Sequence, residues 1–224
     1  MTEKKNKDKA VIFDLDGVLI NTGEFHRQSW YDLAEQEGFS MSDEFFEETF
    51  GMQNYQIIPR LAGKRMSREE IDKLADWKEA RFRELIDQSG KIGLIDGMEE
   101  LIGQLKQEGF KLAIGTSTPA ANLRFLLEHM PVNGVFDAFV SSEDVENSKP
   151  SPDTFLKAAE KLQVPPANSI VVEDAVAGVQ AGKAGGMKVI AVATTRKKDE
   201  LCEADIVFDN PGDLKLSDFT KLLS

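Results

Sequence analysis

Two aspartates separated by a single residue follow a short apolar run near the start of the chain. Residues 10–13 read AVIF, and Asp14, Leu15, Asp16 and Gly17 come directly after them. The run has the composition of a buried strand, and a core strand is not expected to end in bare carboxylates. Either the carboxylates cap a turn in which Gly17 takes a positive φ, or they lie where something requires negative charge.

Other polar side chains follow two later apolar runs, KLAIGTS and SIVVEDA, and a further one lies in the loop ENSKPSPD. These side chains are Thr116, Ser117, Lys149, Glu173 and Asp174. In an open α/β sheet the ligand crevice lies outside the carboxyl ends of the strands. We therefore expect these groups to meet Asp14 and Asp16 at one edge of a sheet.

Carboxylates gathered at one edge raise one another's pKa unless a cation neutralises them. The available ligand atoms are carboxylate and carbonyl oxygens, so Mg²⁺ is the expected cofactor, and zinc is disfavoured without a His or Cys cluster. Lys149 and the hydroxyl of Thr116 suit an anion that also touches the metal, and a phosphoryl group meets both requirements. Taken singly, Lys149 is also compatible with a surface lysine, and Thr116 with a helix N-cap before Pro119.

Short apolar runs alternate with helical patterns from Lys111 onward. KLAIGTS, FDAFVSS, SIVVEDA and MKVIAVAT are typical of strands, and PAANLRFLLEHM and SPDTFLKAAEKL of helices between them. This alternation predicts βαβ units on a parallel sheet that is buried on both faces, and the first apolar run belongs with it. The expected fold class is α/β, with a doubly wound, Rossmann-like parallel sheet as its core.

The stretch from about 24 to 89 predicts only helices and loops. Gly38 is expected to end a first helix, Ser42 to cap a short second one, and Ser67 to open a third in a capping box with Glu70. The sheet is thus interrupted by an all-helical insert. The expected domains are an α/β catalytic core of residues 1–23 and 94–224 and a helical cap of residues 24–93.

The composition of the 224 residues is typical of a folded protein. A formal net charge of −12 disfavours general binding to nucleic acid or to an anionic membrane, since both need a basic face. Cys202 is the one cysteine, so it cannot form an intramolecular disulfide and is expected to be structural. The N-terminal MTEKKNKDKA has the basic character of a signal-peptide start, but Asp14 and Asp16 interrupt the apolar run that follows, and the cytoplasm is the expected location.

Four segments, in order along the chain, resemble the motifs of the haloacid dehalogenase superfamily: DLDGVLINT, GTST, SKPSPDTF and VVEDAVAGVQAGKAGGM. Within the superfamily the chain is similar to the β-phosphoglucomutase-like branch, and the resemblance extends from about Lys9 to Phe208. It implies a phosphoryl-transfer enzyme with a helical cap of the C1 type at the place of the predicted insert. Such a cap closes over the crevice and contributes specificity.

The resemblance also implies a role for each residue of the expected site. Asp14 would be the nucleophile that becomes an aspartyl phosphate, and Asp16 would be the general acid and base, with its backbone carbonyl on Mg²⁺. Thr116, Ser117 and Lys149 would bind the phosphoryl group, and Thr116 and Lys149 would also be catalytic. The implied metal site comprises Asp14, Asp16, Glu173 and Asp174, with Glu173 either a ligand or a partner of the ligands.

Within the insert, the resemblance implies that His26, Trp30 and Gln53 bind substrate. In the mutases a histidine at the place of His26 is thought to help Asp16 adopt its active position when a sugar phosphate is bound. The alternative is a cap-helix histidine that is exposed or hydrogen-bonded to its neighbours. Trp30 is more easily explained by hydrophobic packing than by a substrate contact.

The segment FGMQNYQIIPRLAG departs from the mutase pattern. The mutases carry a Gly-x-Ser-Arg segment whose arginine grips the second phosphate of the substrate, but no arginine follows Gly51 immediately. A bisphosphorylated intermediate would then be held less well, and water would compete for the aspartyl phosphate. Arg60, Lys64 and Arg65 are the candidates to replace the missing arginine.

The leading hypothesis is a Mg²⁺-dependent phosphatase that hydrolyses a small phosphate monoester, with a sugar phosphate as the expected class of substrate. The alternative is a β-phosphoglucomutase, which differs in passing the phosphoryl group to a sugar hydroxyl instead of water. A remote alternative is a non-catalytic phospholigand-binding protein on the same scaffold. The expected partner is a small phosphorylated metabolite, with no nucleic acid, membrane or protein partner, and a monomer is the expected state.

Overall fold

The structure is a computed structural model that describes residues 9–90, 92–130 and 134–224. Residues 1–8, which carry most of the basic N-terminal segment, lie outside the described residues. The contacts divide the chain into two compact units, Met1–Asn21 with Gly93–Ser224 and Thr22–Ile92. We call the first the α/β unit and the second the helical insert.

The described residues of the α/β unit form a parallel sheet with the strand order β3-β2-β1-β4-β5-β6. Its strands are β1 (Ala10–Phe13), β2 (Lys111–Gly115), β3 (Ala138–Val140), β4 (Ser169–Glu173), β5 (Lys188–Val192) and β6 (Ile206–Phe208). The predicted α/β fold with a doubly wound parallel sheet is therefore confirmed. The edge strand β6 was not predicted from the sequence.

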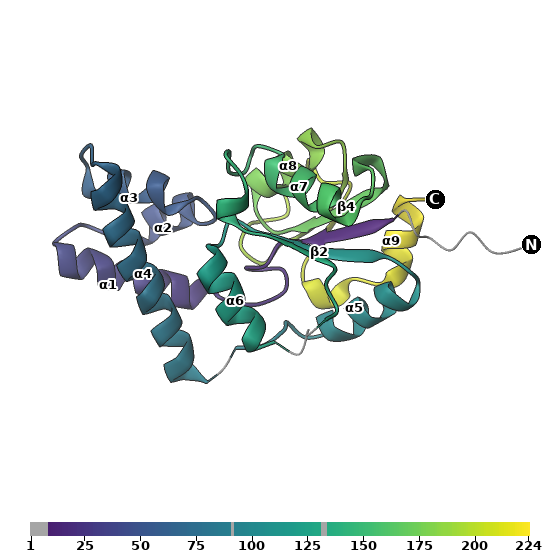
Figure 1. The fold of residues 1–224 in the computed structure, drawn as a ribbon, viewed down its shortest axis with the longest axis horizontal. Helices are drawn as coiled ribbons and strands as arrows, with labels where there is room; N and C mark the ends of the chain where they lie inside the picture. Colours follow the sequence, from purple (N-terminus) through teal and green to yellow (C-terminus); the bar gives the residue numbers. More distant parts are fainter. Residues whose placement is uncertain (1–8, 91, 131–133) are drawn as a thin grey trace, which may run out of the picture. The chain divides into compact units, whose positions relative to one another are not determined.

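Helices cover both faces of this sheet. They are α5 (Met98–Gln107), α6 (Ala120–Glu128), α7 (Asp153–Leu162), α8 (Val176–Ala184) and α9 (Leu216–Leu222), with 3-10 turns at Ser142–Asp144, Pro166–Asn168 and Pro211–Asp213. Figure 1 shows α7 and α8 on one side of β1 and β2, and α5 and α9 on the other. Successive side chains of a strand point to opposite faces. Ile12 accordingly joins the core cluster of Phe155 from α7, whereas the ring of Phe13 meets Phe136 edge-on.

The direction of the strand order reverses beside β1, and this point fixes where a ligand binds. Val11 of β1 pairs with Leu112 of β2 on one side and with Ile170 of β4 on the other. In doubly wound sheets the crevice opens outside the carboxyl ends of the strands at such a switch point. The residues that follow β1 and β4 therefore face the expected crevice.

The helical insert contains four described helices, α1 (Gly23–Glu37), α2 (Asp43–Thr49), α3 (Asn54–Ala62) and α4 (Arg68–Ser89). Three predicted helix signals are confirmed: Gly38 ends α1 in the left-handed conformation, Ser42 accepts from the backbone N–H of Phe45, and Ser67 forms a capping box with Glu70. The helix α3 was not predicted. No described helix of the chain has the length and apolar character needed to cross a membrane.

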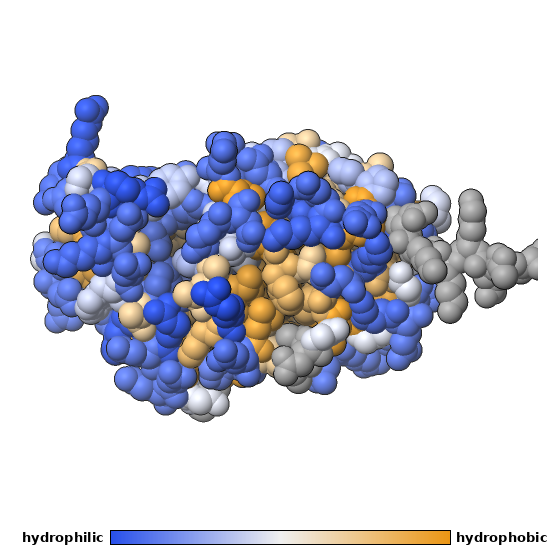
Figure 2. Space-filling view, in the orientation of Figure 1, coloured by the Kyte–Doolittle hydropathy of each residue, from blue (hydrophilic) through white to orange (hydrophobic). Residues whose placement is uncertain are grey.

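The surface seen in Figure 2 is mostly hydrophilic, and this agrees with the acidic composition. Hydrophobic residues gather in one area of the α/β unit on this side, near α6 and β2. Scattered or modest apolar areas are usual on folded proteins and do not by themselves indicate a binding site.

Candidate active site

Lys149 joins the carboxylates that follow β1 and end β4. Its Nζ donates to Asp14 Oδ1 at 2.5 Å and to Glu173 Oε1 at 2.6 Å, and it lies 4.7 Å from the ring centre of Phe155. The side chains of all three charged residues are less than a tenth exposed. The structure therefore brings together Asp14, Lys149 and Glu173 as the sequence predicted, and Lys149 is not a surface lysine.

Burial governs the protonation of these groups. It raises the pKa of Asp14 to about 7, with Glu173 and Asp16 acting in the same direction and Lys149 against it. Burial likewise raises the pKa of Asp174 well above its ordinary value, and the charges of Glu173 and Asp14 add to the effect. For Lys149 burial opposes the charged form, but the two carboxylates outweigh it and raise the pKa of the ammonium. The buried carboxylates around Lys149 thus carry more negative charge than the one ammonium balances.

Glu173 has both carboxylate oxygens occupied within the protein. Oε1 accepts from Lys149, and Oε2 accepts from the backbone N–H groups of Asp174 and Ala175, at 2.8 and 2.7 Å. A Cβ on Gly178 would lie only 1.8 Å from Oε1, so α8 approaches this carboxylate as closely as a glycine allows. Of the two roles expected for Glu173, this geometry favours a partner of the ligands over a metal ligand.

Thr118 holds Asp16, and the sequence analysis did not single it out. Its hydroxyl donates to Asp16 Oδ2 at 2.5 Å, while its backbone N–H donates to Thr116 Oγ1 at 3.1 Å. Thr116 is buried, and Ser117 beside it is half-buried. Pro119, not Thr116, is the N-cap residue of α6, so the cap interpretation of Thr116 is wrong. A second threonine in GTST was the available signal for Thr118.

The acidic groups fit a divalent cation. Asp14, Glu173 and Asp174 each offer a carboxylate oxygen within 4.8 Å of the others. When ionised, these three carboxylates and the single Lys149 leave two negative charges, which one divalent ion balances. An all-oxygen donor set suits Mg²⁺. The carboxylate of Asp16 is not in this group, and its Oδ2 accepts a hydrogen bond from Thr118.

Gly17 allows the loop after β1 to approach Asp174. Its φ is +79°, and a Cβ at this position would lie 2.2 Å from Asp174 Oδ2. A side chain is therefore excluded both by conformation and by space. The turn and the acidic site were alternatives in the sequence, but the structure combines them, because the turn at Gly17 is what brings the loop beside Asp174.

A buried polar cluster lies in the helical insert. Lys78 Nζ of α4 is 2.8 Å from His26 Nδ1 of α1 and donates to Glu79 Oε1 at 3.1 Å, and Asn54 of α3 donates to the same oxygen at 2.7 Å. The His26 ring stacks on Phe82 with centroids 4.1 Å apart. Because an ammonium can only donate, Nδ1 is the acceptor, and the proton of the neutral ring is on Nε2.

Lys78 and Glu79 are almost fully buried, and sequence reasoning missed both. Burial opposes ionisation of Glu79, but the charge of Lys78 and the Asn54 hydrogen bond outweigh it and lower the pKa of this carboxyl group. The available signal was spacing: Lys78 lies four residues after buried Leu74 and four before Phe82, on the apolar face of the helix.

The other substrate-binding candidates of the insert have structural roles. Trp30 is 4% exposed, belongs to the core of the insert, and has Lys78 Nζ 5.0 Å from its ring centre. The Gln53 side chain takes part in a capping box with Gln56 at the start of α3. The packing of Trp30 agrees with its simpler interpretation, and substrate binding by Trp30 and Gln53 stays a prediction.

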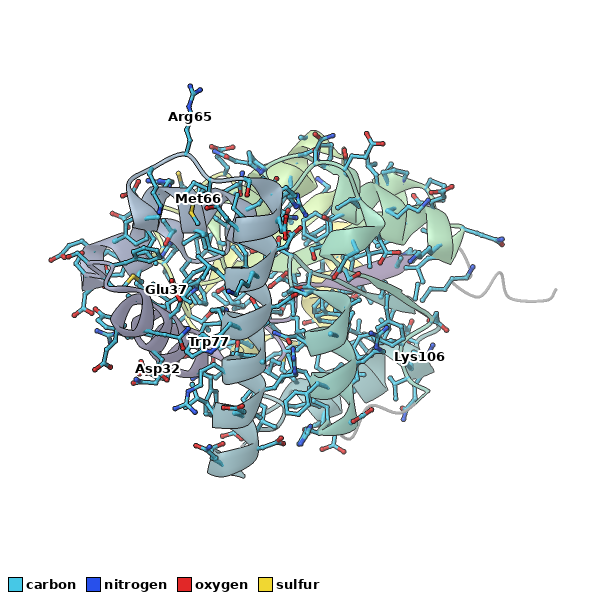
Figure 3. The ribbon with its side chains drawn as sticks, turned by 60° about the vertical axis from the view of Figure 1, so that its left-hand side comes forward. Asp32, Glu37, Arg65, Met66, Trp77 and Lys106 are labelled. Atoms are coloured by element: carbon cyan, nitrogen blue, oxygen red, sulfur yellow. The ribbon has the colours of Figure 1, made fainter. Side chains whose placement is uncertain are left out.

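The three candidates to replace the missing arginine lie on the surface of the insert or pair within it. Arg60 pairs with Glu48 at 2.5 Å. Lys64 is exposed, and Figure 3 shows Arg65 pointing away from the insert into solvent, whereas the next residue, Met66, packs against the core of the insert. None of them contacts the buried polar cluster around Lys78.

The chain belongs to the haloacid dehalogenase-like hydrolases, whose family model matches residues 11–192. The recognised resemblance is thereby confirmed, and the fold and the site have the parts of a phosphohydrolase or phosphomutase.

Among its relatives is β-phosphoglucomutase of Bacillus subtilis, which is 32% identical over 93% of this chain and 92% of its own length. Fructose-1-phosphate phosphatase YqaB of Escherichia coli is 30% identical over 82% of this chain and 95% of its own length. A crystal structure of β-phosphoglucomutase from Clostridium difficile has a TM-score of 0.86 and 29% identity, with 96% of each chain covered. The chain thus resembles both a mutase and a phosphatase.

Proposed function

We propose that the protein is a Mg²⁺-dependent phosphatase that hydrolyses a small phosphate monoester, most simply a sugar phosphate, through a phosphorylated Asp14. The α/β unit is the catalytic domain in this proposal, and the helical insert is its C1-type cap. The observation that carries the proposal is the buried Asp14 carboxylate, held by Lys149 beside Asp174 at the switch point of the sheet.

Asp14 is positioned to be the nucleophile. Lys149 fixes its Oδ1, so Oδ2 is the oxygen that attacks phosphorus, and the bond from phosphorus to the leaving oxygen breaks as the aspartyl phosphate forms. Mg²⁺ held by Asp14, Asp174 and the backbone carbonyl of Asp16 would supply positive charge that neutralises the carboxylates and the phosphoryl oxygens. Lys149 supplies further positive charge to the phosphoryl group.

Asp16 carries the proton in both halves of the reaction. Its protonated carboxyl gives a proton to the leaving oxygen, and its carboxylate then takes one from the water that attacks the aspartyl phosphate. Thr118 donates to Asp16 Oδ2 and so orients this carboxyl group for the transfer. Thr116 and Ser117, in the same loop, bind the phosphoryl oxygens in this proposal.

Glu173 acts through Lys149. Two backbone N–H groups hold one of its oxygens while the other accepts from the ammonium, so the lysine is fixed between Glu173 and Asp14. This keeps Lys149 charged and stationary.

The insert favours water over a sugar hydroxyl as the acceptor. A mutase must retain a bisphosphorylated intermediate, and a cationic side chain is the natural anchor for its second phosphate. In the described insert Arg60 is paired with Glu48, Lys78 is paired with Glu79, and Arg65 points to solvent. The second candidate, β-phosphoglucomutase, is favoured by His26, whose ring is held by Lys78 with Nε2–H as its donor.

One assay separates the two candidates. The purified chain receives β-glucose 1-phosphate with Mg²⁺ and a trace of β-glucose 1,6-bisphosphate, and glucose 6-phosphate and free phosphate are followed together. Phosphate release without isomerisation is expected. Fast glucose 6-phosphate formation with little free phosphate would establish the mutase instead. If neither product forms, the same assay for free phosphate is repeated with a panel of sugar and polyol phosphates.

Asp14→Asn tests the assigned mechanism on whichever substrate is turned over. The variant removes the nucleophile but keeps nearly the same shape, so turnover is expected to fall to background while the circular dichroism spectrum is retained. A matched control is Asp209→Asn, since this exposed carboxylate pairs only with Lys198 among the described residues. Turnover by the Asp14 variant at the rate of the control would refute the mechanism.

The proposal also includes the partner, the oligomeric state and the location expected from the sequence. A small phosphorylated metabolite is the substrate, the monomer is the working state, and the cytoplasm is the compartment. Sedimentation of the purified chain tests the state, which a stable dimer would contradict.

A further inference from the structure

A pair of threonines follows β5, and neither was among the expected site residues. β5 lies beside β4 in the sheet, with Ala191 paired to Glu173, so the carboxyl end of β5 opens on the same edge as the acidic site. The hydroxyl of Thr195 donates to Asp174 Oδ2 at 2.5 Å and lies 3.1 Å from the backbone carbonyl oxygen of Asp174. Thr194 donates to the carbonyl oxygen of Gly17 at 2.7 Å.

The two hydroxyls join the loops that follow three strands. The Thr194 hydroxyl binds Gly17 in the loop after β1, and the Thr195 hydroxyl binds Asp174 at the end of β4. The space at Gly17 shows how tightly these loops meet, since a Cβ there would be 2.2 Å from Asp174 Oδ2 and 3.1 Å from Thr195 Cγ2. The orientation of Asp174 is therefore set by its neighbours.

Fixing Oδ2 determines which oxygen of Asp174 is available. Oδ2 is engaged by Thr195 and closed off by Gly17, whereas Oδ1 accepts no hydrogen bond from any described residue. Asp174 is 3% exposed and shares the acidic group with Asp14 and Glu173. Groups that hydrogen-bond to a metal ligand orient it, and their loss typically costs about 10–100-fold in metal affinity or activity.

We infer that Thr195 is a positioning residue for the divalent cation. Its hydroxyl fixes Oδ2 of Asp174 so that Oδ1 is presented to the ion. The inference rests on the proposed function in one respect, because it takes Asp14 and Asp174 to hold Mg²⁺.

The test is calorimetric titration of MgCl₂ into the metal-free full chain, which needs no substrate. Thr195→Val keeps the shape of the side chain and removes the hydroxyl, and its dissociation constant for Mg²⁺ is expected to rise about ten-fold. Thr195→Ser restores the hydroxyl and is expected to bind within about three-fold of the unaltered chain. Thr220→Val, which removes a hydroxyl bonded to Ser217 in α9, is the matched control and is expected to bind normally.

A second measurement separates positioning from a general loss of structure. In a phosphatase assay with varied Mg²⁺, Thr195→Val is expected to raise the Mg²⁺ concentration for half-maximal activity while kcat recovers at saturating Mg²⁺. If Thr195→Val misfolds, Thr195→Ala provides the same comparison with a smaller side chain.

The outcomes distinguish this inference from the proposed function. Equal Mg²⁺ affinity of Thr195→Val and the unaltered chain would overturn the role of Thr195 and leave the phosphatase standing. Loss of affinity in both Thr195→Val and Thr195→Ser would assign the effect to packing and would also overturn it. If the unaltered chain binds no Mg²⁺, the metal-dependent function fails together with the inference.

Discussion

Charge at single residues is the main constraint on this site. Lys149 is a buried cation with two buried carboxylates as partners, and its contact with the Phe155 ring adds to its fixed position. Such a buried arrangement adds little to the free energy of unfolding, because the cost of removing the charges from water offsets much of their mutual attraction. The buried cation is therefore better explained by the chemistry of the site than by a gain in stability.

Removing the lysine should therefore destabilise the α/β unit. Lys149→Met leaves Asp14 and Glu173 buried without their cation, and loss of one member of a buried ion pair typically costs about 3–5 kcal/mol of unfolding free energy. Denaturant unfolding in the presence of a chelator measures the loss. The control is Lys106→Met, which breaks a partly exposed pair with Asp137 and is expected to cost about 1 kcal/mol or less. Equal losses in the two variants would refute the assigned role of burial.

Much of the residue-level site was predictable. The motif residues Asp14, Lys149, Glu173 and Asp174 meet because parallel strands and the connecting loops deliver them to one edge. Thr118 and Thr195 were not predicted, because a threonine after a strand is equally suited to a turn, and its partner depends on tertiary packing.

At the scale of one helix, α4 combines two kinds of ion pair. Lys78 and Glu79 are buried in the insert, with side-chain exposures of 2% and 9%, whereas Arg68 and Asp72 form an exposed pair one turn apart at its start. The same helix thus offers an internal comparison between a buried and a solvated pair.

Lys78→Met and Arg68→Met should differ sharply in stability. The first leaves Glu79 buried without its cation and is expected to cost about 3–5 kcal/mol, and the second is expected to cost about 0.5 kcal/mol or less. Thermal or denaturant unfolding followed by the fluorescence of the insert tryptophans measures both. A Lys78→Met variant as stable as Arg68→Met would show that the buried cluster is not needed to hold the insert together.

Helix ends were more predictable than buried polar contacts. Ser42, Ser67 and Gly38 occupy their expected cap positions because capping depends on local sequence. The helix α3 was missed because its start is capped by Gln53 and its interior contains Pro59, both unusual helix signals. The buried polar cluster joins Asn54 of α3 to Glu79 and Lys78 of α4. Because Asn54 lies far from the other two in the chain, no short-range sequence pattern predicts their contact.

At the scale of the whole molecule, both connections to the insert leave the α/β unit at neighbouring points. Ile20 forms an antiparallel bridge with Leu94, and the backbone N–H of Ile95 donates to the carbonyl oxygen of Leu19 at 2.8 Å. The segments on either side of the insert are thus already paired within the α/β unit.

The insert should therefore be removable. Replacing Thr22–Ile92 by a short Gly/Ser linker is expected to leave a folded α/β unit, because the closing bridge lies outside the deleted segment. Two-dimensional amide NMR of the shortened chain is expected to show dispersed signals and cooperative thermal unfolding. An aggregated or molten product would show that the insert is required for the α/β unit to fold.

The position of β1 between β2 and β4 also has a consequence during synthesis on the ribosome. The first strand to emerge is fully buried in the finished sheet, yet β4, one of its two neighbours, is made only after the insert and more than half of the α/β unit. The insert has its own core and can form early, and β1 can pair with β2 soon afterwards, but the side of β1 that pairs with β4 stays open until β4 is made. Translation that stalls before residue 169 should therefore release a chain with a folded insert and a first strand that is open, and dependent on chaperones, on its β4 side.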